Sequence, residues 1–337
     1  MATGETTVSA IETVEMHTGG EPVRIVTAGC PPILGRTILE KRRYAREKLD
    51  HIRRLVIFEP RGHYDMYGVL PVEPDLPGAD MGVLFMHNEG YSTMCGHATI
   101  ALGRYAVDHG IVARGRTETI LNLQCPCGLV RVRVASDGAV AFESVPAFAF
   151  ALDATVEVPG FGKVVTDIGY GGAFYTILPA ERMGLTLDAK VRDLVEAADA
   201  MTKAAQKQIA LAHPDDPDLA FLYGTILTDG RDGGGGTDVA SKNICVFAER
   251  EVDRSPTGSG VTARMALMAA RKQVGPEERR WFESITGSRF RARLVSRTQA
   301  GSFDAVTVEV GGHAFYTGNS RFVLEPHDTL GKGFLLR

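Results

Sequence analysis

Two short segments place a nucleophilic side chain directly before a glycine: residues 94–99, which contain Cys95, and residues 256–260, which contain Thr257. The two side chains lie 162 positions apart (257 − 95) in a chain of 337 residues, which is about half its length. A thiol at the start of a helix can ionise near neutral pH, because the free backbone N–H groups and the helix dipole favour its anion. A threonine hydroxyl cannot serve as such a base. The pair therefore predicts a site with two matching positions and one usable base.

The similarity between the two parts of the chain extends beyond these segments. Gly19-Gly20 and Gly171-Gly172 each precede a strand-like run. The distance from the second glycine to the nucleophile position is 75 residues in the first copy (95 − 20) and 85 in the second (257 − 172). Similar order at similar spacing predicts two copies of one supersecondary plan.

Helices must position the two nucleophiles. The runs 98–107 and 261–270 follow them directly and are apolar nearly all round, so we expect each helix to be wrapped by a curved sheet. Glycines 110 and 275 are the expected helix ends. Helical periodicity over residues 38–54 and 187–209 predicts one amphipathic helix in each copy, the second with Leu187, Val191, Leu194, Ala198 and Met201 on one face.

Strand-like runs surround these helices. In the first copy they are residues 23–27, 55–58, 81–87, 119–123, 129–134 and 140–144, and in the second residues 174–178, 221–227, 243–248, 289–295 and 305–310. The length suits two domains. We expect residues 1–150 with 315–337 to form the domain that carries Cys95, and residues 151–314 to form the domain that carries Thr257.

Composition narrows the class of protein. Hydrophobic content of 44% and charged content of 23% are typical of a globular protein, and a net charge of −4 argues against a nucleic-acid partner. No run reaches the ~18 apolar residues of a membrane span, and residues 1–14 lack the pattern of a signal peptide. Five cysteines predict free thiols in the cytoplasm.

Two further patterns predict structure rather than chemistry. Cys125-Pro126-Cys127 has neither the spacing nor the additional ligands of a metal site, so we expect no metal. The glycine run at residues 232–236 lacks the Gly-Lys-Ser/Thr of a phosphate-binding loop and predicts a surface loop.

Four segments in order then resemble the proline racemase family, which has the diaminopimelate epimerase-like fold. They are residues 16–22 (MHTGGEP), 59–63 (EPRGH), 94–97 (MCGH) and 253–256 (DRSP), and the resemblance runs from about residue 12 to residue 334. It implies an α/β (α+β) protein of two pseudo-symmetric domains, each a β-barrel-like sheet around a central helix. The resemblance also implies an active site in the cleft between them.

The chain departs from the family's racemases and epimerases at one position. Those enzymes carry a second cysteine where this sequence has Thr257. The Cys/Thr pair resembles the branch that dehydrates trans-3-hydroxy-L-proline to Δ1-pyrroline-2-carboxylate without a cofactor. Elimination needs one base at Cα, which Cys95 would supply, whereas Thr257 would orient the departing hydroxyl, hydrogen-bond to it or relay a proton through water.

Backbone N–H groups at two helix starts would hold the substrate carboxylate. These are the N–H groups of Gly96, His97, Gly258 and Ser259. The resemblance implies that Asp253 accepts hydrogen bonds from the ring ammonium, and His97 could make a second contact near the ring nitrogen.

Two other functions stay open at this point. A 4-hydroxyproline 2-epimerase or proline racemase would need a second base, and the Cys/Thr pair disfavours it. A non-catalytic amino-acid-binding protein of the same fold would have no need for the thiol of Cys95. In each case the partner is a small molecule, and a homodimer is left open.

Overall fold

The structure is a computed structural model that describes residues 10–231, 233 and 239–336. The loop predicted at residues 232–236 lies outside this range except for residue 233. The first nine residues of the N-terminal segment also lie outside it.

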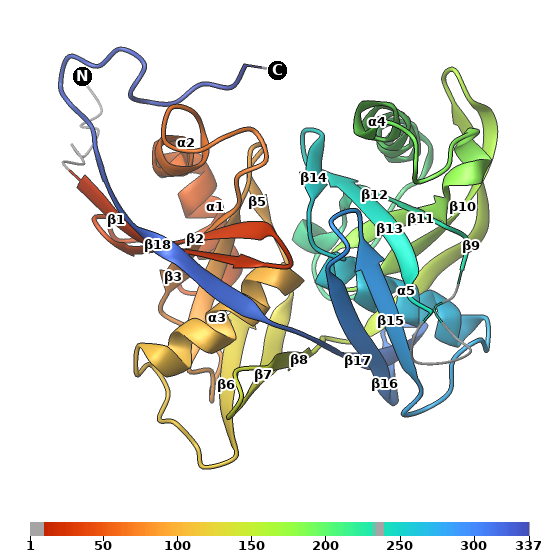
Figure 1. The fold of residues 1–337 in the computed structure, drawn as a ribbon, viewed down its shortest axis with the longest axis horizontal. Coiled ribbons are helices and arrows are strands. Elements are labelled where there is room, and N and C mark those ends of the chain that lie inside the picture. Colours follow the sequence, from red (N-terminus) through yellow and green to blue (C-terminus); the bar gives the residue numbers. More distant parts are fainter. Residues whose placement is uncertain (1–9, 232, 234–238, 337) are drawn as a thin grey trace.

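Two halves lie side by side, and each surrounds one central helix (Figure 1). The first half contains β1 (Ala10–Thr18), β2 (Glu21–Ala28), α1 (Ile38–Lys48), α2 (Asp50–Ile57), β3 (Gly68–Val72), β4 (Met81–Met86), β5 (Tyr91–Ser92), α3 (Gly96–Asp108), β6 (Glu118–Cys125), β7 (Gly128–Ala135) and β8 (Val140–Glu143). The second half contains β9 (Ala147–Val158), β10 (Gly162–Tyr170), β11 (Phe174–Pro179), η1 (Ala180–Met183), α4 (Val191–Gln208), η2 (Pro217–Leu219), β12 (Leu222–Thr228), β13 (Ser241–Phe247), β14 (Glu251–Asp253), α5 (Gly258–Ala270), β15 (Arg279–Ser284), β16 (Arg289–Ala300) and β17 (Phe303–Gly312). The last strand, β18 (Ala314–Val323), returns to the first half.

The strands of the second half form a closed ring. Neighbours run in the order β9, β10, β11, β12, β13, β15, β16 and β17, and β17 pairs with β9 to close it. The first half repeats this order as β18, β1, β2, β3, β4, β6, β7 and β8. Here β8 pairs with β17 of the other half, so one sheet runs through the whole molecule.

The strand β18 lies antiparallel to β1, with Ala10 opposite Val323 and Thr18 opposite Ala314. It is the dark blue strand that crosses between the halves in Figure 1. Because the sheet is continuous through β8, β17 and β18, the predicted domain boundaries at residues 150/151 and 314/315 stay a prediction.

The two central helices are buried on nearly every side, as the sequence predicted. Every residue of α5 from Gly258 to Ala269 is buried, and α3 leaves only Arg104 and Asp108 outside the buried class. Strands β1, β7, β8 and β18 contact α3, and β9, β10, β16 and β17 contact α5. Such helices have no polar face, so they are stable only inside a wrapping sheet.

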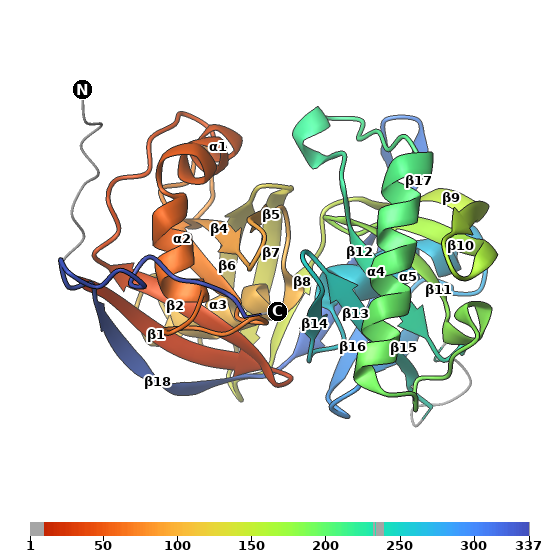
Figure 2. The same cartoon turned by 90° about the horizontal axis from the view of Figure 1, so that it is seen from above.

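A second layer of helices covers the outer face of each sheet (Figure 2). The helix α4 packs on β12, whose residues are all buried because α5 lies on the other side. In the first half, Met81, Val83 and Phe85 of β4 face the core around α3, whereas Leu84 and Met86 face the core under α1 and α2. Because successive side chains of a strand point to opposite faces, β4 contributes side chains to both cores.

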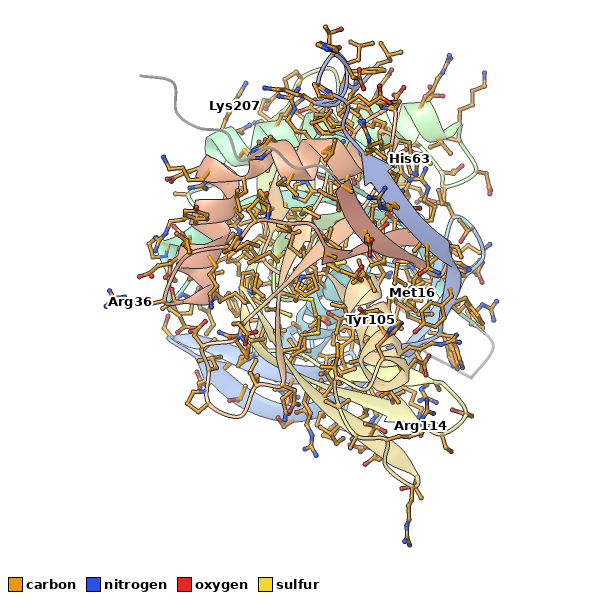
Figure 3. The ribbon with its side chains drawn as sticks, turned by 90° about the vertical axis from the view of Figure 1, so that its left-hand side faces the viewer. Met16, Arg36, His63, Tyr105, Arg114 and Lys207 are labelled. Atoms are coloured by element: carbon orange, nitrogen blue, oxygen red, sulfur yellow. The ribbon has the colours of Figure 1, made fainter. Side chains whose placement is uncertain are left out.

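Charged side chains cover the outside of the first half. Arg36 and Arg114 are exposed and point away from the body of the protein (Figure 3). No helix among the described residues is long and apolar enough to cross a membrane.

Four local predictions need correction. The helix after Thr257 was expected to end at Gly275, but α5 ends at Ala270, and the residue that turns the chain with positive φ is Lys272. Residues 55–58 were expected to be a strand, but residues up to Ile57 belong to α2, because Ile52, Leu55 and Val56 form one buried helical face. The helix expected over residues 38–54 is divided at Leu49, which leaves helical geometry at φ −123° and ψ 15°. The helix expected from residue 187 begins at Val191, and the Val191 side chain is 48% exposed rather than on the buried face.

Candidate active site

A closed cavity between the two halves brings all the predicted site residues together. Its walls include the seven side chains or backbones singled out from the sequence: Cys95, Gly96, His97, Asp253, Thr257, Gly258 and Ser259. The cavity measures about 10 Å³, which is room for about one water molecule. A ring the size of proline therefore does not fit into the cavity in this conformation.

Cys95 is the N-cap residue of α3. Its Sγ accepts a hydrogen bond from the backbone N–H of Ala98 at 3.4 Å and lies 3.1 Å from Nδ1 of His97. Burial raises the pKa of Cys95 well above its ordinary value, although the N–H of Ala98 and the hydroxyl of Tyr67 favour the thiolate. In this cavity the loss of water therefore opposes the stabilisation of the thiolate by the helix terminus.

His97 is neutral in this environment. Burial lowers its pKa to about 3, against the opposing effect of a hydrogen bond with the Pro22 backbone. Its backbone carbonyl accepts a hydrogen bond from Thr18 Oγ1 at 2.9 Å, which ties the start of α3 to the β1–β2 turn. A neutral imidazole beside the sulfur can exchange hydrogen bonds with it but adds no positive charge.

Thr257 precedes α5 at the position that matches Cys95. Its backbone has φ 67° and ψ 88°, a conformation that is uncommon for a β-branched residue. Its Oγ1 is buried beside the carboxyl group of Asp253 and the thiol of Cys245, and it makes no hydrogen bond of good geometry to a described residue. Strain together with an unsatisfied hydroxyl is typical of a functional position, since folding alone would select against both.

Asp253 ends β14 on the same wall as Thr257. Its Oδ1 accepts a hydrogen bond from the Ser255 N–H at 2.7 Å, and Ser255 Oγ accepts one from the Thr257 N–H at 3.1 Å. Burial raises the pKa of Asp253 to about 6, and its bonds with Ser255 oppose this. Arg254 also lowers this pKa, and a further cation bound beside the carboxylate would stabilise its charged form.

The tips of α3 and α5 meet directly. A Cβ atom on Gly258 would lie 2.7 Å from Gly96 Cα, and one on Gly96 would clash with the Gly258 backbone. The two backbones can approach this closely because neither glycine has a side chain. The N-termini of both helices thereby meet at one small volume, an arrangement that favours binding of an anion.

Glycines of both pairs noted in the sequence pack on the opposite half. A Cβ on Gly19, at φ 63°, would lie 2.8 Å from Ser288 Oγ of the second half. A Cβ on Gly172, at φ 96°, would lie 2.6 Å from Met94 Cβ of the first half. Each hairpin turn thus supports the nucleophile loop of the other copy, which explains why the motif is duplicated.

The sequence analysis missed the rest of the cavity wall, which is mostly aromatic. The additional residues are Tyr67, Met94, Tyr175, Tyr223 and Phe247. Met94 adjoins Cys95, but the aromatic residues come from strands and loops far apart in the chain and carry no local motif. Only the closure of the two sheets brings them together.

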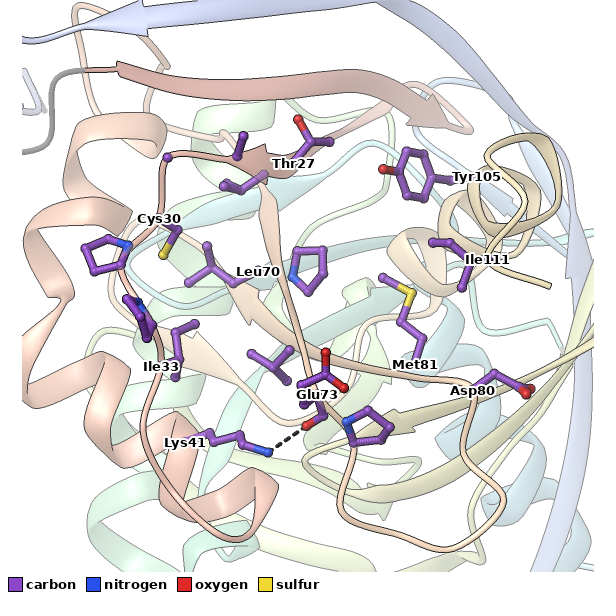
Figure 4. Close-up of a pocket in the computed structure, with 18 residues that line it drawn as sticks. Thr27, Cys30, Ile33, Lys41, Leu70, Glu73, Asp80, Met81, Tyr105 and Ile111 are labelled. Carbon is purple, nitrogen blue, oxygen red and sulfur yellow. Dashed lines mark hydrogen bonds between the residues drawn. The ribbon is translucent and has the colours of Figure 1, made fainter.

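A larger pocket of about 560 Å³ lies on the first half, away from the cavity between the halves (Figure 4). Lys41 Nζ donates a hydrogen bond to the Glu73 carbonyl at 2.6 Å across its wall. Burial raises the pKa of Cys30 to about 11, so this thiol is protonated at physiological pH. The pocket holds no activated nucleophile.

Comparison with known proteins identifies the family. The family model described as Proline racemase matches residues 13–335. The chain belongs to the proline racemase family. This confirms the resemblance that the four sequence segments indicated.

Curated relatives and solved structures in this family are similar over nearly the whole chain. The trans-L-3-hydroxyproline dehydratase of Xenopus tropicalis is 57% identical over 334 residues, which cover 97% of this chain and 95% of the relative. The trans-3-hydroxy-L-proline dehydratase of Homo sapiens is 55% identical over 337 residues, with the same coverage. The crystal structure of a hydroxyproline epimerase from Agrobacterium vitis with bound trans-4-hydroxy-L-proline has a TM-score of 0.91 at 26% identity, covering 98% of this chain and 96% of that one. The fold is therefore that of the family's α/β epimerases, as predicted.

Proposed function

We propose that this protein dehydrates trans-3-hydroxy-L-proline to Δ1-pyrroline-2-carboxylate. The observation that carries the proposal is the pairing of Cys95 with Thr257 at two facing helix starts. An inversion at Cα needs an exchangeable proton on each face, and a threonine hydroxyl is far too weak an acid to supply one. Elimination needs a single base. The dehydratases at 55–57% identity act on the same substrate according to their names.

The two ends of the substrate bind to opposite charges. The carboxylate is held by the N–H groups at the starts of α3 and α5, those of Gly96, His97, Gly258 and Ser259. The ring ammonium is held by Asp253, whose pKa stays raised by burial although the neighbouring Arg254 opposes this. This arrangement stabilises the negative charge that develops when the Cα proton leaves.

Opening and closing of the cavity sets the charge of Cys95. Burial is the main cause of its raised pKa, so the thiolate forms when the halves separate and water reaches the sulfur. Asp253 also raises this pKa. The substrate ammonium neutralises Asp253 and allows the thiolate to persist as the cavity closes.

Cys95 then removes the Cα proton, and the electron pair forms the double bond between Cα and C3 as the hydroxyl departs. Thr257 closes the opposite face and cannot return a proton there, so the anion eliminates rather than inverts. The resulting enamine tautomerises to the product in water. The residues that line the cavity accomplish each of these steps, and the proposal includes no cofactor.

The cytoplasm is the compartment that we propose, because a base thiol must stay reduced. All five cysteines are free thiols. The oligomeric state is not part of the proposal.

Proton NMR tests this function directly. Purified protein without added cofactor is incubated with trans-3-hydroxy-L-proline, trans-4-hydroxy-L-proline or L-proline. We expect dehydration of the first compound and little or no Cα inversion of the other two. Inversion of L-proline at a rate comparable to dehydration would show that a second base operates, and the one-base argument would fail.

A further inference from the structure

The stereochemistry of the substrate decides which wall of the cavity faces the departing hydroxyl. This inference rests on the proposed function. In trans-3-hydroxy-L-proline the carboxylate and the hydroxyl lie on opposite faces of the ring, so the Cα hydrogen and the hydroxyl lie on the same face. A base that removes this hydrogen approaches from the face on which the hydroxyl leaves. The hydroxyl therefore lies on the side of Cys95. Thr257 faces a side of the ring that carries no hydroxyl, so this inference replaces the expectation that Thr257 orients the departing group.

Three tyrosine hydroxyls adjoin the cavity, and two of them have partners. The Tyr67 hydroxyl pairs with Ser92 Oγ at 2.7 Å, and the Tyr175 hydroxyl pairs with Ser259 Oγ at 2.7 Å. The Tyr223 hydroxyl is buried beside the Tyr67 hydroxyl, which already pairs with Ser92, and it makes no hydrogen bond of good geometry to any described residue. A buried hydroxyl without a partner costs about 1–3 kcal/mol, so its retention indicates a ligand that pairs with it.

Packing fixes the Tyr223 ring near Cys95. Its centroid lies 5.1 Å from that of Phe247, 5.5 Å from that of His87 and 5.8 Å from that of Tyr175. The residue is 7% exposed. Tyr223 and Cys95 line the same cavity. Burial raises the pKa of Tyr223 well above the ordinary value, and the charges of Tyr175 and Cys95 add to this effect.

We propose that the Tyr223 hydroxyl binds the 3-hydroxyl of the substrate on the Cys95 face and holds it in position to leave. The Cα–H bond breaks and its proton passes to Cys95 Sγ, while the electron pair becomes the new ring double bond. The C3–O bond breaks, and its pair leaves with the oxygen. That oxygen takes the proton from Cys95 and departs as water, so Cys95 returns to the thiolate. Tyr223 donates a hydrogen bond throughout and keeps its own proton.

Tyr223→Phe removes only the unpaired hydroxyl. We expect kcat/KM for trans-3-hydroxy-L-proline to fall about 10- to 10³-fold, the range for loss of a donor to developing negative charge. The Ki of L-proline, which lacks the hydroxyl, should stay within about threefold of the wild-type value. The melting temperature should be unchanged or higher, because a buried unsatisfied group is lost.

Tyr175→Phe is the matched control, because it removes a hydroxyl that has a partner. It leaves Ser259 unpaired at the carboxylate-binding tip of α5. We expect this variant to have a lower melting temperature and to bind both hydroxyproline and L-proline more weakly, by similar factors. If Tyr223→Phe weakened the binding of both compounds by similar factors, the role of Tyr223 would be merely structural and the proposal would be overturned.

The cis isomer tests the face assignment. In cis-3-hydroxy-L-proline the hydroxyl lies opposite the Cα hydrogen, so the wild type should dehydrate it with at least about tenfold lower kcat/KM, and Tyr223→Phe should narrow this preference. Equal dehydration of both isomers by the wild type would overturn the assignment. Wild type that fails to dehydrate the trans isomer would refute the proposed function itself, whereas full activity in Tyr223→Phe would refute only the role of Tyr223.

Discussion

Asp253→Asn should raise stability and lower activity at the same time. The pKa of Asp253 is about 6 in the folded protein, against an ordinary value of 3.8. That difference of roughly 2 units corresponds to about 3 kcal/mol at about 1.36 kcal/mol per unit. Because the folded-state pKa lies above the unfolded one, the folded protein binds the additional proton, so ionisation of Asp253 destabilises the fold above pH about 6.

The amide retains an oxygen for the Ser255 N–H and carries no charge. We therefore expect Asp253→Asn to be more stable than the wild type at pH 8 by up to about 3 kcal/mol, a rise in melting temperature on the order of 5 °C. The difference should disappear as the pH falls from about 6 toward 3.8, where Asp253 itself becomes protonated. Thermal denaturation at several pH values, without substrate, measures this.

Activity should change in the opposite direction. A charge-assisted hydrogen bond contributes about 1.5–3 kcal/mol, so loss of the contact with the ring ammonium should lower kcat/KM roughly 10- to 150-fold. For the same reason wild-type kcat/KM should fall as the pH drops below about 6.

Glu251→Gln is the control for this experiment. Glu251 is also a fully buried carboxyl with a pKa raised by burial, but its Oε1 accepts a hydrogen bond from the Asn88 N–H at 2.5 Å and the residue does not line the cavity. The Glu251→Gln substitution should leave kcat/KM close to the wild-type value. Unchanged activity in Asp253→Asn would make Asp253 a turn residue, and a lower melting temperature at pH 8 would contradict the desolvation argument.

Three further substitutions test the base, the symmetry and the contact between the halves. Cys95→Ser should lower turnover by at least about 10²–10⁴-fold in a protein with an unchanged circular dichroism spectrum, and near-normal activity would exclude the thiolate as base. Thr257→Cys places a thiol on the opposite wall and should produce Cα inversion of L-proline, detected as solvent deuterium at Cα of D-proline; without inversion, the side chain at this position alone does not separate the two reactions. Gly258→Ala should abolish activity, because its Cβ would lie 2.7 Å from Gly96 Cα and hold the halves apart, whereas Gly90→Ala, with no atom within 4 Å, should be neutral. Activity retained in Gly258→Ala would show that the helix tips need not meet during catalysis.

Much of the fold could be predicted from periodicity alone. The two helices after Cys95 and Thr257 have no polar face, and such helices are stable only inside a wrapping sheet, which is what α3 and α5 show. The prediction was wrong where a short apolar run suits either structure. Residues 55–57 belong to α2 rather than to a strand, since packing against β4 decides between the two.

The sequence by itself determined the residues with a local motif. Cys95 and Thr257 were singled out because each lies at a helix start before a glycine, whereas Asp253 was singled out by the resemblance of its segment to the family. Helix-terminal N–H groups and the nature of a thiol or a hydroxyl are local properties, so the prediction of one base and two faces needed no tertiary information.

Only the tertiary structure decided the charge states and the remaining walls. Desolvation depends on how completely the two halves exclude water, which raises the pKa of Cys95 and Asp253 and cannot be read from spacing. Tyr67 and Tyr223 lie 156 positions apart (223 − 67) and reach one cavity only through closure of the sheets. Whether a buried hydroxyl has a partner is likewise a property of the assembled core, and it singles out Tyr223 among three tyrosines that the sequence does not distinguish.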